Sequence, residues 1–184
     1  MTVATELQNE TFVMPRSTGR TFVDTPIGLL MIEASEIGLT HVVISSSGIE
    51  KTREPEPEPG SILARAKRQF EEYFTGARRE FDLPFDLDAN DFVQRVRDEA
   101  VAHVPYGGTV SYGELAAMAG SPRAARAAGN VMRSNPLMIV IPCHRVVGAD
   151  GSLRGYGGLG CGLSVKRWLL DFESTSGAGL QSGT

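Results

Sequence analysis

Two short helices joined by a tight turn are predicted between residues 111 and 136, and this segment restricts the fold more than any other. Ser111 precedes Glu114 by three positions, the spacing of a capping box at a helix start. Gly120 ends that helix, and Ser121 with a proline behind it predicts that the next helix begins at once. A later Asn-Pro pair ends the second helix. This helix-turn-helix pattern predicts a mostly helical half of the chain.

The first half of the chain has a different pattern. Residues 21–45 contain β-rich runs separated by turn residues, which predict an antiparallel meander. Residues 48–61 form a charged loop punctuated by prolines, and residues 62–76 carry apolar residues at helical spacing before a glycine. Residues 79–87 predict a last strand or extended segment. The predicted fold class is therefore α+β: a small N-terminal α/β domain with an antiparallel sheet and a helix, then a mostly helical C-terminal domain with the helix-turn-helix.

These patterns divide the chain into four parts. They are a flexible arm at 1–20, an N-terminal domain at 21–88, a C-terminal domain at 89–173 and a disordered tail at 174–184. Two further helices are expected in the C-terminal domain, one capped by Asn90 and one capped by Ser164. The apolar run 137–141 between them predicts a short buried strand or extended run.

The composition is that of a globular protein, with 41% hydrophobic and 22% charged residues. No secretory signal or long apolar span is present, and Cys143 and Cys161 are too few for a disulfide framework, so a reducing, cytoplasmic setting is expected. The net charge is −4, yet residues 111–173 carry seven Lys or Arg against four Asp or Glu. This imbalance favours a polyanionic partner for that half of the chain, although a charged face is more often only solvated.

Cys143 and His144 stand side by side where the apolar run stops at a proline. A thiol attacks only as thiolate, and a neighbouring base raises the thiolate fraction. If the backbone turns there, His144 reaches the sulfur directly or through a water, and an acid such as Glu173 orients the imidazole. The alternative is a buried core cysteine beside a surface histidine, and the pair alone favours that alternative.

Three other residues are ambiguous on pattern alone. Arg126 projects from a helix otherwise made of small residues, which suits either insertion into a nucleic-acid groove or plain helix–helix packing. Tyr112 is either a hydrogen-bonding site residue or a half-buried core ring. Asn135 is either a helix stop before proline or an amide that ties the helix end to the segment bearing Cys143.

The segments RAAGNVMRSNPLMIVIPCHRVVGADGSLRGYGG, PYG…SYGELA and K-x-WLL-x-x-E together resemble the 6-O-alkylguanine-DNA alkyltransferases, also called methylated-DNA–protein-cysteine methyltransferases. The resemblance is strong over residues 92–173 and extends weakly to the N-terminal half. It implies a DNA repair enzyme that flips a base out of double-stranded DNA. The methyl group of 6-O-methylguanine, and that of 4-O-methylthymine, would pass to the enzyme's own cysteine. It also implies a single turnover, no cofactor and a monomer, with cooperative binding left open.

The resemblance implies a role for each ambiguous residue. Cys143 is the alkyl acceptor, His144 the base that activates it through a water, and Glu173 the carboxylate that orients the imidazole. Tyr112 donates to guanine N3 and crowds the phosphate, and Arg126 takes the place of the extruded base.

Further residues carry less specific expectations. Asn135 is implied to be a hinge between the recognition helix and the site. The remaining predicted pocket residues are Val146, Gly157, Met132 and Met138, and the remaining predicted DNA contacts are Ser121, Arg123 and Ala125.

The chain departs from the family pattern in two places. Leu159 to Cys161 form an apparent insertion in a loop bordering the pocket, and Arg97 replaces a common tryptophan. Cys161 suggests the hypothesis of a reversible disulfide with Cys143, against the plainer alternative of a bystander. No cysteine precedes Cys143, so the zinc site of some relatives is not expected. Two other function classes stay open: a cysteine hydrolase, and a non-catalytic protein that binds alkylated DNA.

Overall fold

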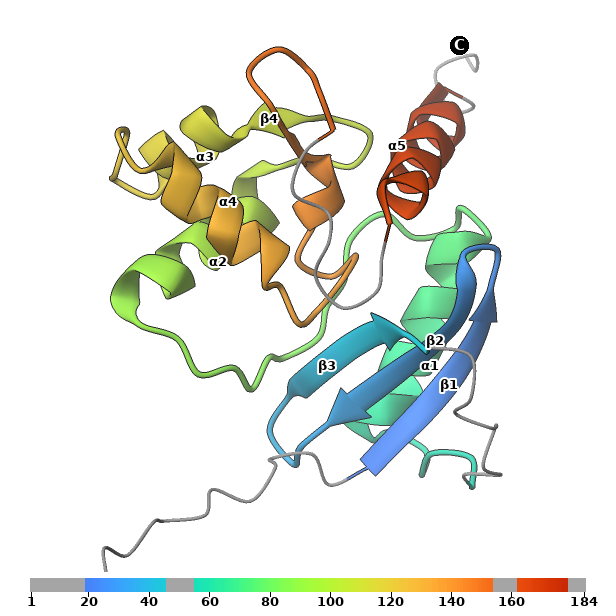
Figure 1. Ribbon diagram of the computed structural model, residues 1–184. Coiled ribbons are helices and arrows are strands. Elements are labelled where there is room, and N and C mark those ends of the chain that lie inside the picture. Colours follow the sequence, from blue (N-terminus) through green and yellow to red (C-terminus); the bar gives the residue numbers. More distant parts are fainter. Residues whose placement is uncertain (1–18, 46–54, 154–161, 179–184) are drawn as a thin grey trace, which may run out of the picture.

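The computed structural model describes residues 19–45, 55–153 and 162–178. Three antiparallel strands in the order β1-β2-β3 open the fold: β1 (Gly19–Thr25), β2 (Gly28–Ala34) and β3 (Leu39–Ile44). One face of the sheet is covered by α1 (Ile62–Phe74), which packs on β1 and β2 (Figure 1). Alternate strand residues such as Leu30 and Ile32 are fully buried, as expected for a sheet with one covered face. The predicted meander and helix are confirmed.

The chain crosses to its second half along an extended segment. Phe85 makes a parallel bridge with Leu39, and Asp86 N donates to the Leu39 carbonyl at 2.9 Å. This segment passes so close to β3 that a Cβ on Gly38 would lie 2.5 Å from the Phe85 carbonyl carbon. A glycine is needed there because no larger residue leaves room for the crossing backbone.

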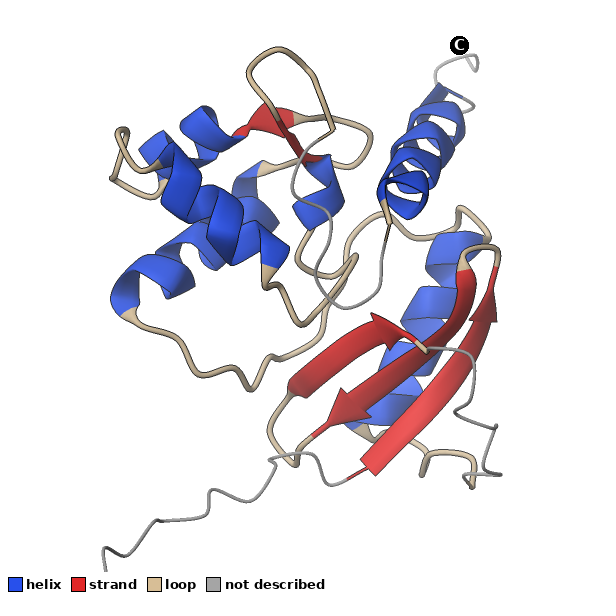
Figure 2. Ribbon diagram, viewed as in Figure 1, coloured by secondary structure: helices blue, strands red, loops and turns tan. Residues whose placement is uncertain are grey.

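The second half is mostly helical, which confirms the α+β fold class (Figure 2). Its elements are α2 (Asp91–His103), β4 (Val110–Ser111), α3 (Tyr112–Met118), α4 (Ala125–Arg133), the 3₁₀ turn η1 (Cys143–Arg145), β5 (Val146–Val147) and α5 (Leu163–Ala178). Asn90 caps α2 through Val93 N, and Ser111 with Glu114 forms the predicted capping box of α3. The two-residue strands β4 and β5 pair in parallel.

Two predicted helix caps and the predicted start of the tail are wrong. Ser121 does not cap the second helix, because residues 121–124 close a turn through Ala124 N donating to the Ser121 carbonyl at 2.8 Å. The helix α4 therefore begins only at Ala125, without a side-chain cap. Ser164 lies inside α5 and not before it, and α5 continues through Ala178, so residues 174–178 are helix where a tail was expected.

Residues 137–141 form a buried turn and not a strand. Leu137 bridges to Val42 of β3, and Met138 bridges back to Ile141. Ile139 has a φ of 72°, which is strained for a β-branched residue. The turn is held from inside by Asn135, whose amide nitrogen donates to the carbonyls of Leu137 and Ile141 at 3.2 and 2.9 Å.

Arg97 of α2 is buried at 8% exposure, and its Nε and Nη1 atoms have no hydrogen-bond partner among the residues the structure describes. Burial lowers the pKa of this guanidinium. A buried charge without a partner is destabilising. We therefore expect Arg97→Met to raise stability by about 1–3 kcal/mol, measured as a higher midpoint in urea unfolding. Arg95→Met on the same helix is the control. A urea midpoint for Arg97→Met that is equal to or lower than that of wild type would contradict the expectation.

No helix in the described ranges combines the length and apolar character needed to cross a membrane.

Candidate active site

Cys143 lies at the first position of η1, directly after the buried turn. Its backbone N–H donates to the Ile141 carbonyl at 2.7 Å, and Arg145 N–H donates to the Pro142 carbonyl at 2.9 Å. The chain therefore turns at Pro142, so the opposite-face rule for adjacent strand residues does not separate Cys143 from His144. The thiol is 5% exposed, and Asn135 Nδ2 donates to its Sγ at 3.1 Å. A donor aimed at the sulfur favours the thiolate.

His144, the residue after Cys143, forms a fully buried pair with Glu173. Glu173 reaches the site from α5, and its Oε1 lies 2.8 Å from His144 Nε2. An ionised carboxylate only accepts, so Nε2 carries the proton and Nδ1 is left as an acceptor. Burial lowers the pKa of His144, although Glu173 acts in the opposite direction. The lowered pKa favours the neutral imidazole. Nδ1 is buried and has no hydrogen-bond partner within the described ranges.

Glu173 is the most heavily bonded side chain of the site. Arg145 Nε and Nη2 donate to its two oxygens at 2.9 Å each, Gly107 N donates at 3.0 Å, and the Tyr73 hydroxyl donates at 2.7 Å. Burial alone would raise the pKa of Glu173, but His144 and Arg145 together hold it well below its usual range. The sequence predicts Glu173 as a site residue but not Arg145, Gly107 or Tyr73. No sequence signal marks Arg145 as buried, and Tyr73 reads as an ordinary core aromatic.

Lys166 is a further charged group of the site that the sequence does not predict. Its side chain is fully buried, and Nζ donates to the Val146 carbonyl at 2.6 Å. Burial lowers its pKa to about 8, with Cys143 acting in the opposite direction. Nζ also lies 5.8 Å from the centroid of the Tyr112 ring, and burial followed by Cys143 raises the pKa of Tyr112. Cys143, Lys166 and Tyr112 therefore act electrostatically on one another.

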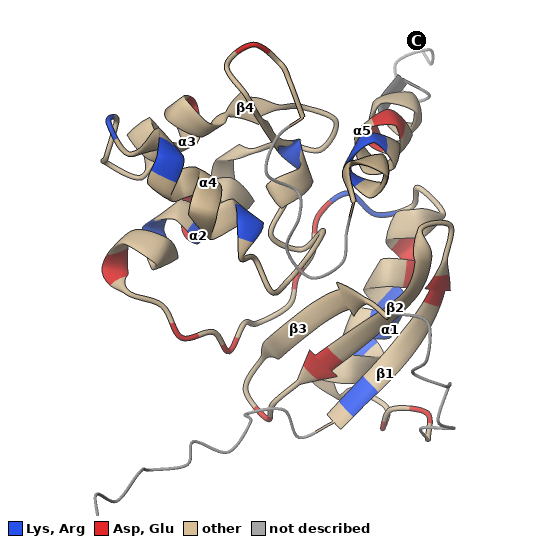
Figure 3. Cartoon of the chain, in the orientation of Figure 1, with Lys and Arg blue, Asp and Glu red and all other residues tan. Residues whose placement is uncertain are grey.

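A surface cleft of about 760 Å³ opens between α4 and the loop after β5. Its walls are Tyr112, Gly113, Ala125, Arg126, Gly129, Asn130, Arg133, Gly148, Ala149 and Asp150. A Cβ on Gly129 would lie 3.6 Å from the Tyr112 ring, so the small residue lets α4 and this ring pack closely. Arg126 is exposed at the cleft, and α4 carries basic but no acidic residues (Figure 3). Tyr112, Ala125 and Arg126 therefore line one cleft, and their role as DNA contacts stays a prediction.

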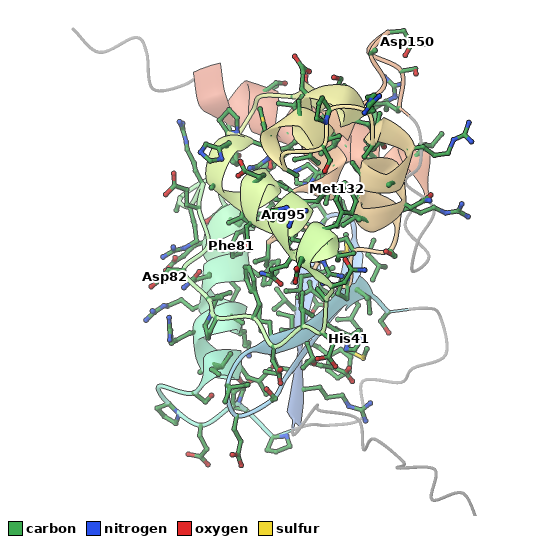
Figure 4. The ribbon with its side chains drawn as sticks, turned by 90° about the vertical axis from the view of Figure 1, so that its left-hand side faces the viewer. His41, Phe81, Asp82, Arg95, Met132 and Asp150 are labelled. Carbon is green, nitrogen blue, oxygen red and sulfur yellow. The ribbon has the colours of Figure 1, made fainter. Side chains whose placement is uncertain are left out.

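The other predicted residues are more dispersed. Arg123 is exposed in the turn ahead of α4, next to the partly buried Ser121. Met132 and Met138 are buried at 4% exposure in the core and do not line the cleft; Figure 4 shows Met132 among the packed side chains, well away from Asp150 at its loop tip. Gly157 and the insertion Leu159 to Cys161 lie outside the described residues.

The described part of the chain contains no group of three or more His, Cys, Asp or Glu that could hold a metal ion.

Both halves of the chain match family models. The model of the 6-O-methylguanine DNA methyltransferase DNA-binding domain covers residues 91–175, and that of the ribonuclease-like domain of the same enzyme covers residues 20–87.

Curated relatives match over most of their length. The chain is 43% identical over 158 residues to the methylated-DNA–protein-cysteine methyltransferase of Mycobacterium tuberculosis strain H37Rv, covering 83% of this chain and 90% of the relative. It is 38% identical over 160 residues to the constitutive enzyme of that name from Bacillus subtilis strain 168, covering 85% and 95%.

Solved structures match in the same way. The crystal structure of the Mycobacterium tuberculosis O6-methylguanine methyltransferase aligns with a TM-score of 0.71 at 41% identity, covering 85% of this chain and 93% of the other. A crystal structure of Mycobacterium tuberculosis OGT in complex with DNA aligns with a TM-score of 0.70 at 42% identity, covering 84% and 92%.

Proposed function

The chain belongs to the 6-O-methylguanine DNA methyltransferase family, and on that premise we propose that it repairs DNA by taking the methyl group of 6-O-methylguanine, and of 4-O-methylthymine, onto Cys143. The observation that carries the proposal is the buried His144–Glu173 pair beside a thiol that accepts a hydrogen bond from Asn135. This arrangement supplies a neutral base and stabilises a thiolate.

The proposed reaction exchanges a methyl group for a proton. His144 Nδ1 takes the Cys143 proton through a water, and the thiolate attacks the methyl carbon in line. The S–C bond forms as the C–O bond breaks, and the electron pair passes to the guanine, which regains one proton. Tyr112 donates to guanine N3 as charge develops there, which is electrostatic stabilisation of the leaving group. The thioether product is stable to water, so each molecule acts once.

Base flipping is the second part of the proposal. A methyl group inside a duplex is out of reach of a thiol that is 5% exposed, so the nucleotide must leave the stack. The cleft beside α4 and the exposed Arg126 support this step, because a side chain that fills the vacated space offsets the cost of extrusion.

The test is the intact mass of the protein after incubation with a duplex that contains one 6-O-methylguanine. We expect a gain of one methylene group in mass, mapped to Cys143 and stoichiometric with the duplex. An unmethylated duplex is the control. Unchanged mass with binding retained would instead identify a non-catalytic binder, and repeated turnover of a small ester would identify a hydrolase.

Arg126→Ala is expected to slow transfer from duplex DNA by roughly tenfold or more, because extruding a base costs a few kcal/mol. Transfer from free O6-benzylguanine should change little, since a free base needs no extrusion. Single-turnover rates with both substrates check this, with Arg68→Ala, an exposed change on α1 away from the cleft, as the control. Equal slowing on both substrates would rule out the proposed role.

A further inference from the structure

Tyr73 connects the N-terminal sheet domain to the site of the C-terminal domain. It lies near the end of α1, its side chain is fully buried, and its hydroxyl donates to Glu173 Oε1 at 2.7 Å. The two residues are 100 positions apart in the chain. The N-terminal half therefore supplies one of the groups that hold the buried carboxylate.

Three donors meet on that one oxygen. Glu173 Oε1 accepts from Tyr73, from His144 Nε2 at 2.8 Å and from Arg145 Nη2 at 2.9 Å. The other oxygen accepts from Arg145 Nε and Gly107 N. Arg145 and Gly107 fix the plane of the carboxylate. Tyr73 and His144 donate to the same oxygen, so the strength of one hydrogen bond affects the other.

The hydroxyl is held in place by its own ring. The Tyr73 ring centroid lies 5.1 to 6.1 Å from four other rings, namely Phe74, Phe81, Tyr106 and Phe172. These neighbours come from α1, from the two connecting segments on either side of α2, and from α5. A side chain packed on so many sides cannot change rotamer without opening the core, so its hydrogen bond is preorganised.

We propose that Tyr73 is a positioning residue for alkyl transfer: its hydroxyl fixes Glu173 so that His144 keeps its proton on Nε2 and presents Nδ1 as the base for Cys143. The inference rests on the proposed function and extends its machinery into the N-terminal domain. Burial, followed by the charge of Glu173, raises the pKa of Tyr73 far above its ordinary value, so the hydroxyl remains a donor at every working pH.

The groups around the His144–Glu173 pair determine how the loss of the Tyr73 hydroxyl changes the pH dependence of alkyl transfer. Tyr73 from α1 donates to Glu173, and Arg145 from η1 and Lys166 from α5 act on His144 through their charges. Tyr106, in the loop after α2, also lies near Glu173, but burial raises the pKa of its hydroxyl, which therefore carries no charge that could act on the pair. Removing the Tyr73 hydroxyl leaves the carboxylate more basic, and a more basic carboxylate favours imidazolium. The pKa of His144 then rises, less of it is neutral at a given pH, and the acid limb of the rate profile moves to higher pH.

The experiment compares full-length wild type, Tyr73→Phe and Tyr106→Phe in single-turnover transfer from free O6-benzylguanine across pH. We expect Tyr73→Phe to be roughly tenfold slower near pH 7, as for loss of one hydrogen bond to a charged group, with its acid limb about half to one pH unit higher. The rate of Cys143 alkylation by iodoacetamide should show the same shift. Tyr106→Phe removes a neighbouring hydroxyl that does not bond Glu173 and should match wild type.

Two results would overturn the inference: an unshifted acid limb in Tyr73→Phe, or an equal loss of rate at every pH, which a purely structural role predicts. If Tyr73→Phe does not fold, ¹⁵N chemical shifts of wild-type His144 decide, since a proton on Nδ1 contradicts the proposal and one on Nε2 supports it. A wild type that gains no methyl group from the methylated duplex refutes the proposed function itself, whereas an active wild type with an unaltered Tyr73→Phe variant refutes only the role of Tyr73.

Discussion

Cys143→Ser should reduce methyl uptake from a methylated duplex to below about 1% of wild type, while leaving the fold and duplex affinity unchanged. The serine oxygen fits the space of the sulfur and can still accept from Asn135 Nδ2, which lies 3.1 Å from Sγ. However, a hydroxyl ionises far less readily than a thiol, and a neutral histidine is too weak a base to compensate. Intact-mass and single-turnover measurements check uptake, and fluorescence anisotropy with a labelled duplex checks affinity.

Cys161→Ser is the matched control, because Cys161 is the other cysteine of the chain and lies outside the described residues. Its methyl uptake should equal that of wild type. The hypothesis of a Cys143–Cys161 disulfide stays a prediction, checked by non-reducing peptide mapping after mild peroxide. Methyl uptake by Cys143→Ser at any residue would contradict the assignment of the acceptor.

Glu173→Gln is expected to impair both stability and transfer. The substitution removes the charge that pairs with Arg145 and gives His144 Nε2 an amide in place of a carboxylate. Leaving a buried arginine without its partner costs about 3–5 kcal/mol, which urea unfolding measures. Transfer should fall by about 100-fold or more in the folded fraction, because His144 loses the group that fixes its tautomer.

The pH dependence gives a second check on Glu173. Its pKa in the folded protein is depressed, so the stability it contributes is fully present above the unfolded value of about 4.3 and is lost as pH falls toward the folded value. Between about pH 5 and about pH 3, Glu173→Gln should therefore lose less stability than wild type. Asp171→Asn, an exposed change on the same helix, is the control. An equal loss of stability in Glu173→Gln and wild type over this pH range would contradict this account.

Local signals predicted much of the fold. The capping box at Ser111 and the cap at Asn90 were correct because each depends on a hydrogen bond to a backbone N–H three residues away. Ser121 failed for an equally local reason, since a turn through Ala124 uses the residues that a helix start would need. The predicted strand at 137–141 was wrong because a buried turn and a buried strand have the same apolar composition.

Contacts distant in the chain could not be predicted from the sequence. The side chains of Cys143, His144 and Asn135 lie within ten positions, so motif and resemblance pointed to them together. Tyr73 and Lys166 carry no such signal, because an aromatic residue on a helix face is usually core and a lysine is usually exposed. Only the folded topology shows that one donates to Glu173 and the other to the Val146 carbonyl.

The aromatic cluster around Tyr73 has a consequence for how the protein unfolds. Trp168 and Phe172 of α5 stack at 5.0 Å between ring centroids, and both contact Phe74 of α1, so rings from the two domains form one cluster. Unfolding the sheet domain alone would expose these rings and strip a donor from a buried carboxylate. The two domains should therefore melt as a single cooperative unit, and amide hydrogens in β2 and α5 should exchange with the same global opening free energy.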